Sequence, residues 1–300
     1  MIADFIKTFL AVFLLLFAFQ QTRAQDDDVI KVDSSIVVIN AAVFDSQGLP
    51  VSDLIRKQFS VYEDGIQQEI LDFLPESTPF AAVILVDTSG SMESRVSLAR
   101  GAAIKFIEGM RNDDVVAVYN FDSEVALVSD FGSFRGLNDK AYELKSKGMT
   151  KLNDAVYEAA AALSNRPEKR KAIIVLSDGE DTMSSRSMDK ALKAALDVGA
   201  NIYTVDMADT TTPSKNRGQN QAALKKFAER TGGTFVASPG GQSMRDAFVR
   251  IVSELGQQYT LTYSPTNTKT DGKWRNIEVR VAKPNLTIRT RKGYNAAKSK

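Results

Sequence analysis

One short polar segment carries the residues whose types and spacing could do chemistry, Asp87-Thr88-Ser89-Gly90-Ser91. It directly follows a six-residue apolar run, 81–86, which predicts a strand buried on both faces of a parallel sheet. Asp87, Ser89 and Ser91 stand at alternate positions just beyond the carboxyl end of that strand. Open α/β sheets bind ligands at this edge, and hard oxygen donors suit Mg²⁺ or Mn²⁺. The segment therefore predicts a metal-centred binding site.

Two later segments supply further oxygen donors. Thr150 follows Gly148-Met149 in a loop that precedes a predicted helix, so its hydroxyl lies in a strand-to-helix connection. Asp178 follows a second apolar run, 172–176, which predicts another buried strand. Because the carboxyl ends of parallel strands share one edge of a sheet, we expect Asp178 to lie at the same edge as Asp87.

The composition excludes several classes of active site. The chain of 300 residues contains no cysteine, which rules out disulfides, thiolate metal sites and thiol nucleophiles. It also contains no histidine, which rules out a Ser-His-Asp triad and an HExxH zinc site. The formal net charge of +1 gives no indication of a nucleic-acid or anionic-membrane partner. We predict no catalytic residues, and we expect that the protein is not an enzyme.

The N-terminal residues have the pattern of a targeting segment. Lys7 precedes an apolar run from Thr8 to Phe19, and a small-x-small cleavage pattern ends at Ala24. This pattern predicts a cleavable signal peptide over residues 1–24 and a secreted or periplasmic protein that begins at Gln25. An uncleaved membrane anchor is the alternative, and the apolar run is short for it, because a spanning helix needs about 20 apolar residues. After cleavage we expect no membrane insertion.

The order of predicted elements indicates an α/β domain between two β segments. Strand signals fill 36–73, with a hairpin turn at Asp64-Gly65 and a return strand at 68–73. From Phe80 strands and helices alternate, which predicts a doubly wound, mostly parallel sheet. The predicted strands of this domain lie near 81–86, 115–119, 124–128, 171–176, 200–205 and 234–236, and the helices near 96–110, 134–146, 152–164, 186–198, 219–230 and 242–256.

Strand signals return after Gly256, where Tyr259, Leu261 and Tyr263 alternate with polar residues. We therefore divide the mature chain into an N-terminal β segment (25–77), the α/β domain (78–257) and a C-terminal β segment (258–300). Neither β segment is long enough to bury a good core alone. We predict that the two pair into a small β-sandwich into which the α/β domain is inserted.

The candidate site resembles that of a known family. Asp87-Thr88-Ser89-Gly90-Ser91-Met92 resembles the DxSxS motif of the von Willebrand factor type A domain family. Thr150 matches the separate threonine loop of that family, and Leu176-Ser177-Asp178-Gly179 matches its third, aspartate-bearing segment. Thr231-Gly232-Gly233-Thr234 resembles the family's lead-in to its last strand, so the resemblance covers about residues 78–257.

The flanking segments carry a looser resemblance. Val61-Tyr62-Glu63-Asp64-Gly65 and Arg291-Lys292-Gly293-Tyr294 are similar to segments of exported bacterial proteins built around such a domain.

The resemblance implies an intact metal-ion-dependent adhesion site. Ser89, Ser91 and Thr150 would ligate the metal through their hydroxyls, and Asp87 and Asp178 would act directly or through water. The implied cation is Mg²⁺, with Mn²⁺ or Ca²⁺ as alternatives. One coordination vertex would remain for an Asp or Glu of a protein ligand. We therefore expect an exported binding or adhesion module.

Other interpretations remain open at this point. An envelope scaffold or assembly protein would keep the same site, and a metal-dependent hydrolase would use the metal to activate water. The absence of histidine, and of a second carboxylate pair, disfavours the hydrolase. Asp87 alone could also cap a helix. We interpret Trp274 as a core or cross-strand residue. We interpret the remaining acids near predicted strand ends as ordinary loop residues: Asp122, Glu180, Asp181, Asp206 and Asp209.

Overall fold

The computed structural model describes residues 36–75, 77–93, 95–132, 148–209, 215–237 and 240–298. All of them belong to one compact unit, Ser34–Lys300. The predicted signal peptide and the helix predicted near 134–146 lie outside the described residues. Within the described ranges, none of the helices has the length and apolar character that crossing a membrane requires.

A six-stranded sheet forms the centre of the α/β domain, as the alternating pattern predicts. In spatial order its strands are β10 (Phe235–Val236), β9 (Ala200–Asp206), β8 (Arg170–Ser177), β5 (Phe80–Asp87), β6 (Val115–Phe121) and β7 (Val125–Gly132). All neighbours pair in parallel except β6 and β7, which are antiparallel at one edge. The predicted short strand near 124–128 is therefore a real edge strand.

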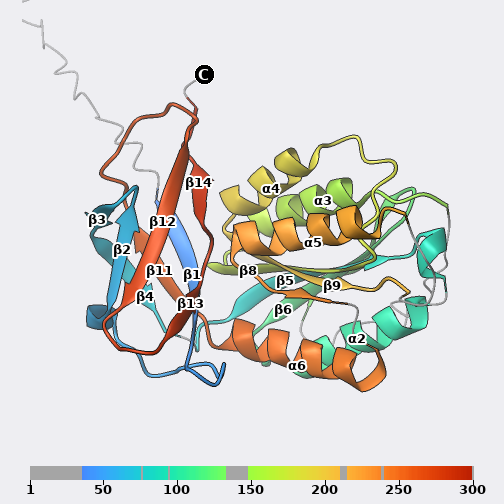
Figure 1. Ribbon diagram of the computed structural model, residues 1–300, viewed down its shortest axis with the longest axis horizontal. Helices are drawn as coiled ribbons and strands as arrows, with labels where there is room; N and C mark the ends of the chain where they lie inside the picture. The colour runs from blue at the N-terminus through green and yellow to red at the C-terminus, as the bar shows by residue number, and fades with distance from the viewer. Residues whose placement is uncertain are drawn as a thin grey trace, which may run out of the picture. The chain divides into compact units, whose positions relative to one another are not determined.

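Helices cover both faces of this sheet (Figure 1). One face carries α2 (Val96–Glu108) and α6 (Gly241–Gly256). The other carries α3 (Leu152–Ser164), α4 (Met188–Asp197) and α5 (Arg217–Thr231). Successive residues of β5 pack against helices on opposite faces of the sheet. Ile84 packs in the core with α2 and α6, and Leu85 packs in the core with α3 and α5. This two-sided burial explains why β5 is apolar at every position before Asp87.

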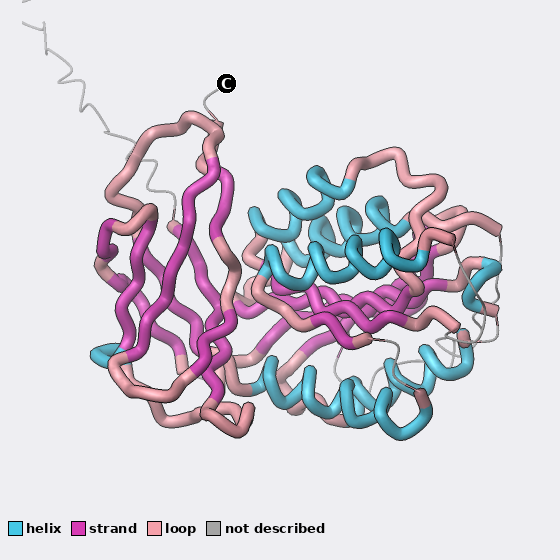
Figure 2. The backbone as a smooth tube through the Cα atoms, viewed as in Figure 1, coloured by secondary structure: helices cyan, strands magenta, loops and turns pink. Residues whose placement is uncertain are grey.

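The N-terminal and C-terminal β segments interleave in two antiparallel sheets, as predicted (Figure 1); their strands are among those drawn in magenta in Figure 2. The first sheet has the order β13 (Thr287–Arg289), β1 (Val37–Phe44), β11 (Tyr259–Tyr263) and β4 (Ile70–Leu74). The second has the order β14 (Gly293–Asn295), β12 (Trp274–Val281), β2 (Phe59–Glu63) and β3 (Ile66–Gln68). Residues of both sheets share one apolar core, in which the ring centroids of Phe59 and Tyr259 are 5.1 Å apart. Each sheet thus needs strands from both ends of the chain.

One detail of the sandwich differs from the sequence predictions. The return strand predicted at 68–73 is divided, because β3 pairs with β2 while β4 crosses to the other sheet and pairs with β11. The strand predicted around Tyr259–Tyr263 is present as β11, and its polar residues Thr260 and Thr262 are buried like their apolar neighbours. Thr260 donates its hydroxyl to Asn40, and Asn40 in turn donates to the carbonyl of Gly199, at 2.9 and 3.2 Å. The polar face of β11 is therefore covered by contacts that lead to the α/β domain.

Candidate functional site

Asp87 is the last residue of β5, and its side chain is completely buried. Its carboxylate accepts the backbone N–H of Ser89 at 2.9 Å and the hydroxyl of Ser177, the last residue of β8, at 2.6 Å. The strand partners Val86 and Leu176 stand directly before these two residues. The parallel register therefore brings the ends of β5 and β8 together, as the two apolar runs predict.

A short turn folds the two serines toward each other. The 3₁₀ turn η2 (Gly90–Met92) follows Ser89, and the Oγ atoms of Ser89 and Ser91 are 3.2 Å apart. Ser89 is buried, whereas Ser91 is exposed. The backbone N–H of Gly90 donates to the carbonyl of Gly148 at 3.2 Å. That bond ties the serine segment to the loop that carries the predicted threonine.

Thr150 is buried and is held by the loop that follows Asp178. Its N–H donates to the hydroxyl of Thr182 at 2.9 Å, and its carbonyl accepts the N–H groups of Thr182 and Met183, both at 3.0 Å. Asp178 itself is half-buried, and its Oδ1 accepts the N–H of Glu180 at 3.0 Å. All five sequence-predicted residues therefore lie in three loops at the carboxyl edge of β5 and β8, and hydrogen bonds connect these loops.

Among the described residues, the charge of Asp87 has no basic partner. Burial raises the pKa of Asp87 to about 7, although hydrogen bonds from Ser177 and Ser89 act in the opposite direction. Asp206, the last residue of β9, is also buried, but Arg217 lies 3.6 Å from its carboxylate. Across the described ranges, no basic side chain pairs with Asp87. A buried carboxylate without a cation is costly, so this site favours a bound positive charge.

The donor set fits a hard divalent cation. Two carboxylates and three hydroxyls offer only oxygen, which Mg²⁺ prefers, and Mg²⁺ usually keeps several waters as ligands. In the part of the chain that the structure describes, no group of three or more Asp, Glu, His or Cys side chains could hold a metal ion. A cation at this edge must therefore rely on the hydroxyls as well as on Asp87 and Asp178. The five residues of the site offer this combination of two carboxylates and three hydroxyls.

The other acids near this edge have partners of their own. Asp122 accepts the hydroxyl of Ser123 at 3.1 Å and the N–H of Glu124 at 3.0 Å. Asp209 pairs with Arg95 at 3.4 Å. These bonds hold loops, in agreement with the interpretation of both acids as ordinary loop residues.

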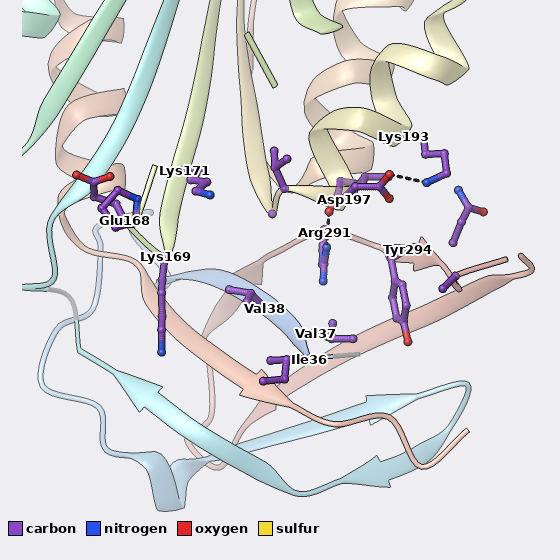
Figure 3. Close-up of a pocket in the computed structure, with 16 residues that line it drawn as sticks. Ile36, Val37, Val38, Glu168, Lys169, Lys171, Lys193, Asp197, Arg291 and Tyr294 are labelled. Carbon is purple, nitrogen blue, oxygen red and sulfur yellow. Dashed lines mark hydrogen bonds and ion pairs between the residues drawn. The ribbon is translucent and has the colours of Figure 1, made fainter. Parts of the chain in front are cut away.

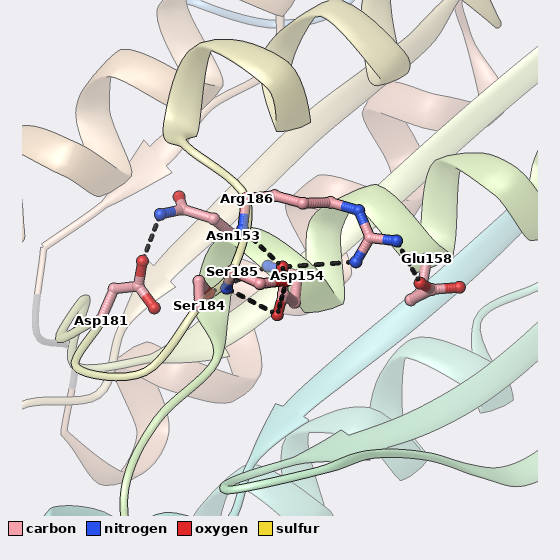
Figure 4. A network of polar contacts seen from close by, with 7 residues as sticks. All are labelled: Asn153, Asp154, Glu158, Asp181, Ser184, Ser185 and Arg186. Carbon is pink, nitrogen blue, oxygen red and sulfur yellow. Dashed lines mark hydrogen bonds and ion pairs between the residues drawn. The ribbon is translucent and has the colours of Figure 1, made fainter.

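Sequence reasoning missed a network that fixes the loop after Asp178 (Figure 4). Asp154, in the first turn of α3, accepts the N–H groups of Ser185 and Arg186, both at 3.0 Å, and the hydroxyl of Ser185. Burial acts to raise the pKa of Asp154, but these hydrogen bonds outweigh it and lower the pKa below its usual value. Arg186 also pairs with Glu158 at 3.3 Å.

A second contact in this network joins Asn153 of α3 to Asp181. Asp181 was interpreted as a solvated loop residue; it is exposed overall, yet its carboxylate holds the loop against α3. The network therefore positions the segment after Asp178 relative to the helix that follows Thr150. The signal for this network in the sequence is Asp154, an acid four residues after Thr150 in the first turn of a predicted helix.

Comparisons with known proteins agree with this architecture. Residues 82–180 match the sequence family of the von Willebrand factor type A domain. Among curated proteins none matches the chain.

Three solved structures illustrate the likeness. The von Willebrand factor type A protein from Catenulispora acidiphila is 12% identical over 90% of this chain and 76% of that one, with a TM-score of 0.50. The pilus adhesin SpaC from Lactobacillus rhamnosus GG, in an open conformation, is 10% identical over 82% of this chain and 49% of that one, also with a TM-score of 0.50. The PilB minor pilin from Streptococcus sanguinis is 14% identical over 60% of this chain and 62% of that one, with a TM-score of 0.48. This chain thus spans less than two thirds of the minor pilin and about half of SpaC. At these identities the likeness to the first two structures shows the fold alone: the α/β domain has the architecture of a von Willebrand factor type A domain.

Proposed function

We propose that this protein is an exported binding module that captures a protein ligand through a divalent cation. The cation would be held by Asp87, Ser89, Ser91, Thr150 and Asp178. The observation that carries the proposal is the buried carboxylate of Asp87, which has no basic partner in the described ranges. When bound, Mg²⁺ would offer an open coordination position to an outside carboxylate.

Each residue of the set would have a distinct task. Ser177 and the backbone of Ser89 hold the Asp87 carboxylate in one orientation, so it needs no rearrangement on binding. Ser91 is exposed and lies at the outer side of the site, where a ligand would approach. The Asp154 network keeps the loop of Asp178 in place.

The rim of the site favours a protein ligand. Met149 and Met183 lie next to Thr150 and Thr182, and 52% and 44% of their surfaces are exposed. Exposed methionine is adaptable and binds apolar side chains of varied shape. A ligand whose acidic residue has an apolar neighbour would therefore bury both groups at once. Water would be excluded from the charged contact, which strengthens it.

The proposal assigns no catalytic residue. The chain has no histidine to act as a general base, and the acids beside the site hold loops. The comparison with a pilin and a pilus adhesin supports an adhesive role outside the cytoplasm, in line with the predicted signal peptide.

A displayed peptide library tests the proposal. Peptides with one fixed Asp among random residues are bound to residues 25–300 in Mg²⁺ and eluted with EDTA. We expect enrichment of peptides with an apolar residue beside the Asp, and none on Asp178→Ala. A matched library with Asn in place of Asp is the control. If no peptide depends on Mg²⁺, or if the Asn library gives the same sequences, the proposed function is wrong.

A further inference from the structure

A cleft of about 510 Å³ opens beside the start of β8, whereas Asp178 of the candidate metal site follows the end of that strand. Figure 3 shows the residues that line the cleft. It lies where β8 and β9 begin, and the sandwich strands β1 and β14 contribute its other wall. Apolar surface of the cleft comes from Val38, Leu196 and the ring of Tyr294. Its charged lining residues are Glu168, Lys169, Lys171, Lys193, Asp197 and Arg291. Arg291 and Tyr294 belong to the segment Arg291-Lys292-Gly293-Tyr294, to which the metal-dependent function gives no role.

Arg291 is a buried cation that forms no ion pair with the described acids; the charge of Asp197 acts on it from a distance, and Asp197 is itself paired with Lys193. Only 7% of its surface is exposed, and its Nη1 donates to the carbonyl of Leu196 at 3.0 Å. Its Nε has no hydrogen-bond partner in the structure, and none of the described acids forms an ion pair with it. The aromatic ring of Tyr294 also lies beside the guanidinium, with its centroid 5.6 Å from Cζ. Burying an uncompensated guanidinium is costly, so an anionic oxygen here would be favourable.

Lys171 adds a second uncompensated charge. It lies near the start of β8, is half-buried, and makes no ion pair with the described acids. Burial lowers the pKa of Lys171, and the charge of Glu168 acts in the opposite direction. Glu168 is already engaged by Arg166, through two hydrogen bonds of 3.0 and 2.6 Å. The acid whose charge acts on Lys171 is therefore already engaged by Arg166.

The remaining lysines of the cleft are paired. Lys193 contacts Asp197 at 2.5 Å (Figure 3). Lys169 contacts Asp72, which lies outside the cleft, at 2.7 Å. The unbalanced charge of the cleft is thus two, from Lys171 and Arg291. A ligand with two negative charges would neutralise it.

We propose that this cleft binds a small organic dianion, a phosphate monoester or a dicarboxylate, between Arg291 and Lys171. The planar guanidinium matches a carboxylate or phosphate group, and the lysine supplies a point charge beside it. Val38, Leu196 and the ring of Tyr294 provide apolar surface for the body of the ligand. The volume falls within the range of about 300–1,000 Å³ that is usual for small-molecule sites. The inference does not depend on the proposed metal-dependent function.

Calorimetric titration of the full mature chain, in EDTA and at fixed ionic strength, tests the proposal. The probes are phenyl phosphate and phthalate, with benzoate as the singly charged comparison. We expect saturable binding of at least one dianion, and an affinity for benzoate lower by about tenfold, since one charge-assisted contact is absent. The stronger dianion identifies the head group as phosphate or carboxylate.

Lys171→Gln should weaken binding of that dianion by about tenfold or more. Lys169→Gln, which removes a lysine already paired with Asp72, should change the affinity by no more than about twofold. Arg291 is not used as the test position, because its bond to Leu196 also supports the fold. The proposal is overturned if neither dianion binds saturably, or if Lys171→Gln binds as tightly as the wild type.

Discussion

Replacing Asp87 with Asn should stabilise the metal-free protein at pH 8 and at the same time abolish its response to Mg²⁺. Burial raises the pKa of Asp87 from an ordinary 3.8 to about 7. Each pKa unit corresponds to about 1.4 kcal/mol, so the buried charge costs up to about 4 kcal/mol. The gain in Asp87→Asn will be smaller, because Ser177 donates to the carboxylate and already accepts the N–H of Gly179. An amide at this position would compete for that hydroxyl.

The pH dependence has a definite sign. Because the pKa of Asp87 is higher in the folded than in the unfolded state, the folded state binds more protons between pH 3.8 and about pH 7. The free energy of unfolding of the metal-free wild type should therefore fall as the pH rises through this window, and level off above it. Bound Mg²⁺ replaces the proton and should flatten the slope. Asp87→Asn should lack this contribution to the slope without any metal.

Urea unfolding followed by circular dichroism measures these differences, in EDTA at pH 5 and pH 8 and in Mg²⁺ at pH 8. The matched control is Asp206→Asn, which removes a buried strand-end carboxylate that Arg217 already compensates. It should destabilise the protein with and without metal and leave the Mg²⁺ response intact. If Asp87→Asn is less stable than wild type in EDTA at pH 8, yet still gains stability from Mg²⁺, the reasoning about the buried charge is refuted.

Three further predictions concern the site and its framework. Mg²⁺ at ten times its dissociation constant should raise the free energy of unfolding by about 1.4 kcal/mol. Asp178→Ala should abolish this rise in the same urea assay. If the variant shows the full rise, Asp178 is not a ligand of the metal. Truncation after Gly256 removes β11 to β14, so hydrogen-exchange protection of β1 and β2 should collapse; retained protection would mean that these strands fold without C-terminal partners. Arg289 pairs with buried Glu254 at 2.7 Å. Arg289→Met should lower the free energy of unfolding by about 2 kcal/mol at pH 8. This is less than the loss expected for a fully buried ion pair, because Arg289 is partly exposed. Because burial raises the pKa of Glu254, more of its carboxyl group is protonated at pH 5, and the loss of stability should be smaller there. The loss should also largely disappear when Arg289→Met is combined with Glu254→Gln. Equal losses at both pH values would exclude the charge of Glu254 as the cause.

The α/β sheet could be predicted because two-sided burial leaves a strong pattern. β5 is apolar at every position before Asp87, and β8 is apolar from Ala172 to Leu176, a pattern that a solvent-facing strand would not tolerate. The return strand after β2 could not be divided correctly, because the division depends on a partner far along the chain. Ile70 leaves the hairpin to pair with Tyr263, and no local signal near Glu69 announces this crossing.

The candidate site shows the same contrast. Asp87, Ser89 and Ser91 are neighbours in sequence, so a single turn suffices to gather them and the motif predicts their meeting. The bonds from Ser185 and Arg186 to Asp154 join residues about 30 positions apart, and only the fold reveals them. The uncompensated charge of Arg291 is likewise invisible in the sequence, because its burial arises where the sandwich meets α4.

The two candidate sites lie at opposite ends of one strand, and this separation has a measurable consequence. Lys171 lies near the start of β8 and Asp178 follows its end. At about 3.3 Å per residue the two are about 20 Å apart, which is more than twice the screening length of about 8 Å at physiological salt. Direct electrostatic coupling between a cation at one end and a dianion at the other should be negligible, and distant sites usually act additively. The dianion should therefore bind with equal affinity in EDTA and in Mg²⁺. A difference beyond about twofold would mean that a conformational change links the metal edge to the junction with the sandwich.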